Sequence, residues 1–209
     1  MIWRRLLLVS LLATACGDAV VDGDYRGEPH LRVEGVFRGN TGDATIRSPH
    51  LGILWSTPWF EERLEATLTP ILATPLSSNF SFEIWDLPPI SATFLDPFCG
   101  AWLALGTFVV YDDVDENGRV EMELEDEGLR ILAPDTALGL GEVHYLLYTN
   151  RALEGCEPFP DLDAGFHVIL AYDGWVGRSE KAYVEISLFP PQEFFPFSVE
   201  EELRSGSSP

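Results

Sequence analysis

Positive charge is scarce in this chain of 209 residues, which holds 13 lysines and arginines against 34 aspartates and glutamates. The resulting net charge of -21 repels nucleic acid and anionic lipid head groups, so neither is expected as a partner. Cations are the natural small ligands of such a chain. Because 46% of the residues are hydrophobic, the acidity coats a chain that can fold and does not indicate disorder.

The sequence also lacks the motifs that identify common hydrolases. It contains no Gly-x-Ser-x-Gly, no His-Glu-x-x-His and no Ser-x-x-Lys. Carboxylates are so numerous that choosing a glycosidase pair among them would be arbitrary. An envelope hydrolase that acts on polysaccharide or peptide stays open as an alternative function, but no catalytic residues are predicted for it.

The first residues are typical of a targeting segment. Arg4 and Arg5 form a basic region, and the apolar run Leu6–Ala15 is too short to span a bilayer as a helix. Leu12–Gly17 resembles a bacterial lipobox, in which small residues precede a cysteine that is lipidated after cleavage. The resemblance departs from the usual pattern at Ala13, where leucine is common, and it implies that Cys16 is the lipidation site. Secretion without lipidation, or an uncleaved membrane anchor, is the competing interpretation.

These features divide the chain into four parts. They are a signal peptide over residues 1–15, lipidated Cys16 with a flexible tether over 16–30, one domain over 31–198, and a C-terminal tail over 199–209. In enterobacterial lipoproteins an Asp after the lipidated cysteine favours retention in the inner membrane. Gly17 occupies that position here, so the resemblance favours the outer membrane.

Cysteine is rare, with three residues in the whole chain. Assigning Cys16 to a lipid leaves Cys99 and Cys156, an even number that predicts one disulfide in a secreted protein. Such a crosslink stabilises the fold by about 4 kcal/mol through the loop-closure entropy of the unfolded chain. Two buried free thiols are the alternative.

Long amphipathic helical patterns are missing, whereas short alternating or apolar segments recur between turn residues. This pattern predicts an all-β domain, specifically an antiparallel β-sandwich. Strands are expected at Leu31–Phe37, Ala44–Arg47, Leu51–Trp55, within Trp59–Ala73, and at Phe80–Ile84, Ala101–Tyr111, Val120–Glu125, Glu142–Thr149, Phe166–Tyr172 and Lys181–Phe189. Ala101–Tyr111 is apolar almost throughout, which predicts the central strand of the fold, with both faces covered.

An acidic loop follows that central strand. Its oxygen-bearing groups recur at the spacing of an EF-hand calcium loop, with Gly118 at the sixth position to permit the sharp turn. The predicted metal ligands are the side chains of Asp113, Asp115, Asn117 and Glu121 and the main-chain carbonyl of Arg119. The sequence therefore predicts a structural Ca²⁺ site.

The match fails at the twelfth position, where Leu124 replaces the bidentate glutamate of an EF-hand. The alternation over Val120–Glu125 indicates that a strand leaves the loop, so the loop is expected to join two strands as a β-hairpin. A bare Asn117-Gly118 hairpin turn without metal is the alternative. That interpretation explains the glycine but not the carboxylates around it.

Two tryptophans are candidates for stacking against a ligand. Trp175 lies in a glycine-flanked loop, and Trp59 follows a proline. Exposed aromatic rings of this kind bind sugars in many β-sandwich domains. Packing in the core or against a loop is the competing interpretation for each.

Three segments resemble a group of secreted bacterial lipoproteins that are common in myxobacteria and carry a prealbumin-like β-sandwich. The segments are Leu51–Trp55, Phe80–Pro89 and Leu105–Tyr111, the last of which runs into the acidic loop. The resemblance spans about residues 31 to 150 and implies a sandwich fold and a surface location. It implies no catalytic residues.

The sequence therefore favours a non-catalytic protein of the cell envelope that is attached to the membrane by a lipid. A calcium-stabilised domain of this kind is expected to bind a protein or glycan partner or to act as a structural module.

Overall fold

The computed structural model describes residues 27–56, 66–73, 76, 79–118, 120–125, 128–172, 175–179 and 181–196. The predicted signal peptide, Cys16, Trp59, Arg119 and the C-terminal tail lie outside these described residues.

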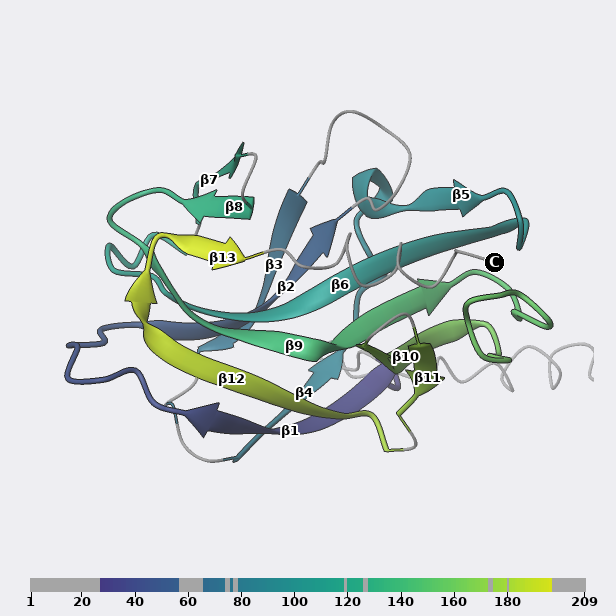
Figure 1. The fold of residues 1–209 in the computed structure, drawn as a ribbon, viewed down its shortest axis with the longest axis horizontal. Coiled ribbons are helices and arrows are strands. Elements are labelled where there is room, and N and C mark those ends of the chain that lie inside the picture. The colour runs from purple at the N-terminus through teal and green to yellow at the C-terminus, as the bar shows by residue number, and fades with distance from the viewer. Residues whose placement is uncertain are drawn as a thin grey trace, which may run out of the picture.

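The described part of the chain is built from β-strands with one short 3-10 helix, η1, at Ile90–Ala92 (Figure 1). The strands are β1 Leu31–Gly39, β2 Pro49–Ser56, β3 Ala66–Ala73, β4 Asn79–Ile84, β5 Phe94–Asp96, β6 Ala101–Asp112, β7 Met122–Glu125, β8 Gly128–Ile131, β9 Thr136–Thr149, β10 Gly165–Tyr172, β11 Trp175–Arg178, β12 Tyr183–Gln192 and β13 Phe194–Pro196. The predicted all-β class is confirmed.

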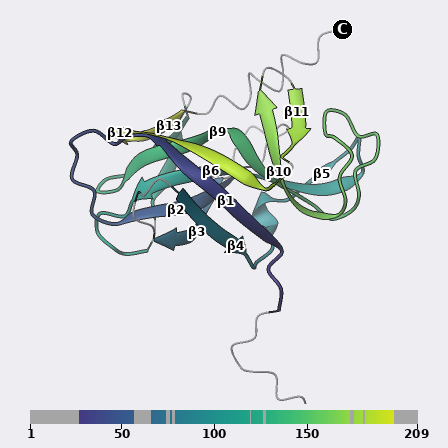
Figure 2. The same cartoon turned by 90° about the horizontal axis from the view of Figure 1, so that it is seen from below.

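Ten of these strands form one large sheet. Its main path runs β3-β2-β6-β9-β12-β1-β4, while β5 pairs with β6, and the β10–β11 hairpin joins through β9. The sheet curls into a half-barrel, so that its end strands β3 and β4 approach each other (Figure 2). The remaining strands, β13, β8 and β7, form a small three-stranded sheet.

This arrangement corrects the prediction of an antiparallel sandwich. β1 runs parallel to β12, so the large sheet is mixed. The described strands also divide unequally, because a single curled sheet holds ten of them and encloses much of the core by itself. Alternation within a strand reports which face is buried but not which strand lies beside it, and this is why the sequence left the pairing open.

β6 is the central strand that its apolar sequence predicts. The even-numbered residues Ala104, Phe108 and Val110 belong to a core cluster inside the curl of the sheet. The odd-numbered residues face the other way and belong to two further clusters. Ala101, Leu103 and Leu105 lie in the first, and Val109 and Tyr111 lie in the second.

Each cluster on that outer face has its own cover. The loop between β9 and β10 contributes the buried residues Leu153, Cys156 and Leu162 to the first cluster. The small sheet contributes Ile131, with Met122 packed against it, to the second cluster. The first cover lies beyond β9 in the sequence, whereas the second begins with β7, the next strand after β6.

Two expected elements differ from the observed ones. Residues 44–48 form no strand, because the main-chain N–H groups of Arg47 and Ser48 donate to the carboxylate of Asp112 and not to a neighbouring strand. β9 begins at Thr136, six residues before the predicted start. Its first half contains Gly139 and Gly141, where an added Cβ would crowd Leu188 and Phe108, respectively.

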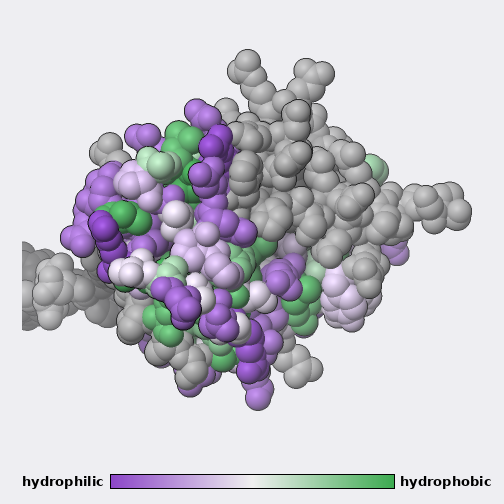
Figure 3. All heavy atoms as spheres, turned by 60° about the vertical axis from the view of Figure 1, so that its left-hand side comes forward, coloured by the Kyte–Doolittle hydropathy of each residue, from purple (hydrophilic) through white to green (hydrophobic). Residues whose placement is uncertain are grey.

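The surface of the domain is mainly polar where the described residues can be seen. In Figure 3, hydrophilic side chains dominate the coloured part of the face, and hydrophobic groups form small separate patches. This distribution fits a chain with a net charge of -21.

Candidate metal centre

The acidic loop begins where β6 ends, at the left of Figure 1. Both edges of β6 are occupied there, by β2 on one side and β9 on the other. The strand after the loop, β7, therefore has no free edge of β6 to pair with and pairs with β8 in the small sheet. The predicted β-hairpin is wrong, and the loop is a connection from the large sheet to the small sheet.

Asp112, the last residue of β6, has a structural role. It is 3% exposed, and its carboxylate accepts the main-chain N–H groups of Arg47 at 3.1 Å and Ser48 at 2.6 Å. The main-chain N–H of Asp113 in turn donates to the carbonyl of Ser48 at 3.0 Å. These bonds fix the direction in which the chain leaves β6, so Asp113 is held at a defined place.

Asp113 organises the loop around its own side chain. It is 2% exposed, and its two carboxylate oxygens accept the N–H groups of Asn117 at 3.2 Å and Gly118 at 2.9 Å. Glu116 and Gly118 both have positive φ, 56° and 70°, which lets the chain wrap back toward Asp113. The glycine predicted at the sixth position is therefore required by the turn.

Asp115 lies on the exposed side of the same loop. Its Oδ1 accepts the main-chain N–H of Asn117 at 3.2 Å, and its Oδ2 accepts the Asn117 side-chain amide at 2.8 Å. The predicted ligands Asp113, Asp115 and Asn117 are thus brought together. Glu121 is exposed and lies outside the acidic group, and its main-chain carbonyl accepts the N–H of Leu132 at 2.8 Å.

A third carboxylate, Asp135, completes the group and was missed by the sequence analysis. Asp113, Asp115 and Asp135 each offer one oxygen, and these three oxygens lie within 4.8 Å of one another. We call these residues the acidic trio. Asp135 is 4% exposed, and its Oδ1 accepts the N–H of Val114 at 2.9 Å.

The pairing of β6 with β9 explains why Asp135 is there. Asp112 lies opposite Thr136 in the register, so the residues one step beyond, Asp113 and Asp135, leave the sheet side by side. They belong to the two connections between the large sheet and the small sheet, β6 to β7 and β8 to β9. The acidic trio therefore lies where these two connections come together.

The electrostatics of the trio favour a cation. Burial raises the pKa of Asp135, and the negative charges of Asp113, Asp115 and Asp112 raise it further, against the opposing effect of the Val114 N–H. Burial, together with the charges of Asp113 and Asp135, also raises the pKa of Tyr111 to about 12. Carboxylate oxygens in such a group suit hard divalent cations such as Ca²⁺ or Mg²⁺.

The predicted disulfide between Cys99 and Cys156 is present, with the two Cα atoms 5.4 Å apart. Cys99 lies just before β6, and Cys156 lies in the loop that covers the first outer cluster. The crosslink therefore fixes that loop to the beginning of the central strand.

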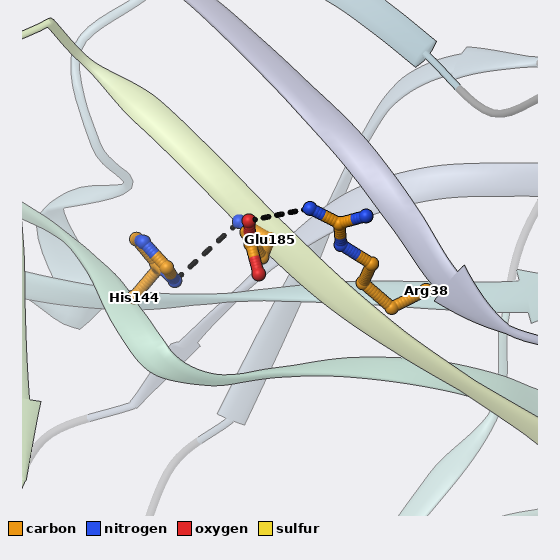
Figure 4. A network of polar contacts seen from close by, with 3 residues as sticks. All are labelled: Arg38, His144 and Glu185. Atoms are coloured by element: carbon orange, nitrogen blue, oxygen red, sulfur yellow. Dashed lines mark hydrogen bonds and ion pairs between the residues drawn. The ribbon is translucent and has the colours of Figure 1, made fainter.

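A second polar group lies on β1, β9 and β12 (Figure 4). Arg38 Nη2 donates to Glu185 Oε1 at 3.0 Å, which lowers the pKa of Glu185. The main-chain N–H of Glu185 donates to Nδ1 of His144 at 3.4 Å, so the His144 proton is assigned to Nε2. Burial lowers the pKa of His144 and keeps its ring neutral at pH 7, while the charge of Glu185 opposes this effect.

Of the two predicted stacking residues, the structure describes Trp175. It begins β11 and does not lie in the loop that the sequence predicted. It is 50% exposed, opposite Tyr172 on β10. It is therefore available at the surface and is not part of the core.

Among the described residues, no helix is long and apolar enough to cross a membrane. Searches of family models, curated proteins and solved structures found no match to this chain.

Proposed function

We propose that this protein is a lipid-anchored component of the cell envelope, and that its domain is a non-catalytic binding or structural module stabilised by calcium in the acidic trio. The observation that carries the calcium part of the proposal is the close approach of three carboxylates, Asp113, Asp115 and Asp135, two of which are buried.

Three carboxylates at this separation repel one another strongly. At an effective dielectric constant of about 20, two unit charges 4.8 Å apart repel by about 3.5 kcal/mol. Among the described residues, none donates to the second oxygen of Asp135. A divalent cation would neutralise the group and occupy that acceptor.

Calcium is favoured over magnesium because the ligands sit on an irregular loop. Ca²⁺ accepts six to eight oxygens in flexible geometry, whereas Mg²⁺ requires a near-ideal octahedron. Extracellular calcium modules bind with dissociation constants of about 0.1 to 1 mM. At about 1 mM calcium, such binding stabilises the fold by about 0.4 to 1.4 kcal/mol.

The envelope location is supported by two separate features. Cys16 ends a segment that resembles a lipobox, and the disulfide between Cys99 and Cys156 suits an oxidising compartment outside the cytoplasm. The resemblance of residues 31 to 150 to secreted lipoproteins is part of the same proposal. By the sorting resemblance at Gly17, the outer membrane is the expected site.

A hydrolase has less support from the described residues. His144 and His167 each bond a main-chain group through one ring nitrogen, and neither belongs to the acidic trio. The hollow formed by the β9–β10 loop is lined by acidic and nonpolar residues, and none of its described lining residues is a histidine. These features favour the non-catalytic role.

Calcium titration followed by thermal melting tests the cation site. The full-length protein in non-ionic detergent should melt at a higher temperature in calcium than in chelator, and Asp115→Ala should abolish the increase. Asp43→Ala is a matched control, because Asp43 is an exposed loop carboxylate outside the trio. An unchanged melting temperature in the wild-type protein would sink the calcium proposal.

Cell fractionation tests the anchor. Cys16→Ser should move the protein from the membrane fraction to the soluble fraction, because the lipidation site is lost. If the variant stays in the membrane fraction, lipidation at Cys16 is not what holds the protein there.

A further inference from the structure

The β10–β11 hairpin carries an exposed pair of aromatic rings. Tyr172 and Trp175 lie directly opposite each other in the register, with ring centroids 5.2 Å apart and planes inclined by 49°. Tyr172 is 47% exposed and Trp175 is 50% exposed. About half of each residue is therefore in contact with solvent even though the two rings pack together.

Gly177 makes room for the indole. A Cβ at this position would overlap the six-membered ring of Trp175, so the ring lies over the glycine backbone two residues along the same strand. Gly177 does not have a positive φ, which means that the glycine is needed here for space and not for an unusual conformation. The indole is thus laid along the hairpin with one side on the backbone.

The opposite face of the hairpin is fixed in the core. Ile169, Ala171 and Val176 are buried in the first outer cluster, beneath the disulfide-linked loop. Because this face is packed in the core, the strands that carry the aromatic pair rest on a close-packed support. A rigid aromatic surface loses little conformational entropy when it binds a ligand.

The chemistry of the pair suits a sugar ring. Tyrosine and tryptophan combine a flat apolar body with a polar group, and the C–H-rich face of a pyranose can stack on such a surface. Among the described residues, the hydroxyl of Tyr172 and the indole N–H of Trp175 have no hydrogen-bond partner, so both can bond to sugar hydroxyls.

Charge selects among the sugars. The net charge of -21 repels anionic polysaccharides, whereas neutral oligosaccharides carry no such penalty. We infer that Tyr172 and Trp175 form a binding platform for a neutral oligosaccharide of the cell surroundings. This inference rests on the proposed function as a binding module, but it does not involve any residue of the acidic trio.

Isothermal titration calorimetry of the full-length protein tests the platform. The probes are hexamers of β-1,4-linked glucose and of β-1,4-linked N-acetylglucosamine, with polygalacturonate as the anionic comparison. A polyoxyethylene detergent is needed, because maltoside detergents present sugar head groups that would compete. At least one neutral hexamer should bind, and polygalacturonate should not.

Three variants separate stacking from other effects. Trp175→Ala and Tyr172→Ala should each weaken binding by about tenfold or more. Gly177→Ala should weaken it while both rings remain, because the new Cβ displaces the indole. Trp102→Ala is the matched control, since Trp102 is 48% exposed but lies opposite Leu95 on a different hairpin, and its loss should leave binding unchanged.

Several results would overturn the inference. They are the absence of heat with either neutral hexamer up to about 10 mM, equal losses in Trp102→Ala and Trp175→Ala, or binding of polygalacturonate alone. Melting curves show whether each variant folds, and Gly177→Ala keeps the test usable if removal of an aromatic ring unfolds the hairpin. Asp115→Ala should lose the calcium response and keep sugar binding, so failure of either proposal can be told from failure of the other.

Discussion

Asp135→Asn should have opposite effects with and without calcium. The substitution removes one negative charge from the acidic trio but keeps the shape of the side chain and an oxygen that can accept the Val114 N–H. In chelator it relieves repulsion between buried carboxylates, so the variant should be more stable than the wild-type protein. In calcium it removes one carboxylate of the proposed site, so the stabilisation expected from the ion should shrink.

The expected sizes follow from the binding constant of such sites. With a dissociation constant of about 0.1 to 1 mM, calcium at about 10 mM stabilises the wild-type protein by about 1.4 to 2.7 kcal/mol. For a domain of this length, that corresponds to an increase of about 3 to 11 °C in the melting temperature. Asp135→Asn in chelator should gain on the order of 1 kcal/mol, as is typical when an unfavourable charge is removed.

The pH dependence of stability should also show that the charge on Asp135 is unfavourable in chelator. The pKa of Asp135 is raised in the folded protein, so the folded state binds this proton more tightly than the unfolded state does. In chelator, the contribution of Asp135 to stability therefore rises as the pH falls from neutral through the raised pKa, and levels off below the ordinary value of 3.8. Asp135→Asn should remove this contribution, which thermal melting across pH can measure.

Asp112→Asn is the matched control. Asp112 is also a buried carboxylate near the trio, but its oxygens hold the main-chain N–H groups of Arg47 and Ser48. Oδ1 of Asp112 accepts from both Arg47 and Ser48, and Oδ2 also accepts from Arg47. An amide would place an NH2 group at one of these two positions, facing a main-chain N–H, so this variant should lose stability in chelator and in calcium alike. If Asp135→Asn is destabilising in chelator and keeps the full calcium response, Asp135 serves only as an acceptor for Val114, and the reasoning is refuted.

Three further predictions test other parts of the fold. Because burial lowers the pKa of His144, the contribution of this residue to stability should be present above pH 6.5, its ordinary pKa, and lost as the pH falls below that value. His144→Gln should therefore make the denaturation midpoint less dependent on pH in that range. Replacing Cys99 and Cys156 with serine should lower the free energy of unfolding by about 4 kcal/mol, measured by denaturant titration, and an unchanged value would contradict a crosslink in solution. Removing calcium should speed amide exchange in β7 and β8 but not in the centre of β6. Equal protection of β7 and β8 with and without calcium would show that the ion does not stabilise the small sheet.

The local features of the fold were readable from the sequence. The apolar run Ala101–Tyr111 predicted a central strand because such a run needs cover on both faces, and β6 has that cover. The spacing of Asp113, Asp115 and Asn117 predicted an oxygen-lined loop because these positions are close along the chain. The even number of cysteines left after Cys16 predicted the disulfide from the count alone, although the two residues are 57 apart in the sequence.

The features that were missed depend on strand neighbours. Asp135 approaches Asp113 only because β6 pairs with β9 in the register that sets Asp112 opposite Thr136. The hairpin expected at Asn117-Gly118 was wrong because β2 and β9 already occupy both edges of β6. Side-chain alternation contains neither piece of information, since it gives the face of a residue but not the identity of the adjacent strand.

The disulfide lies near the beginning of β6, and the acidic trio lies near its end. The odd-numbered residues of this strand face two separate covers, a loop near its beginning and the small sheet near its end. Neither cover belongs to the large sheet, so each must be held against it by other means. The disulfide between Cys99 and Cys156 holds the loop at one end. At the other end, Asp113 and Asp135 lie on the two connections to the small sheet, and without a cation their charges would push these connections apart. A bound cation would therefore do at the end of β6 what the disulfide does at its beginning.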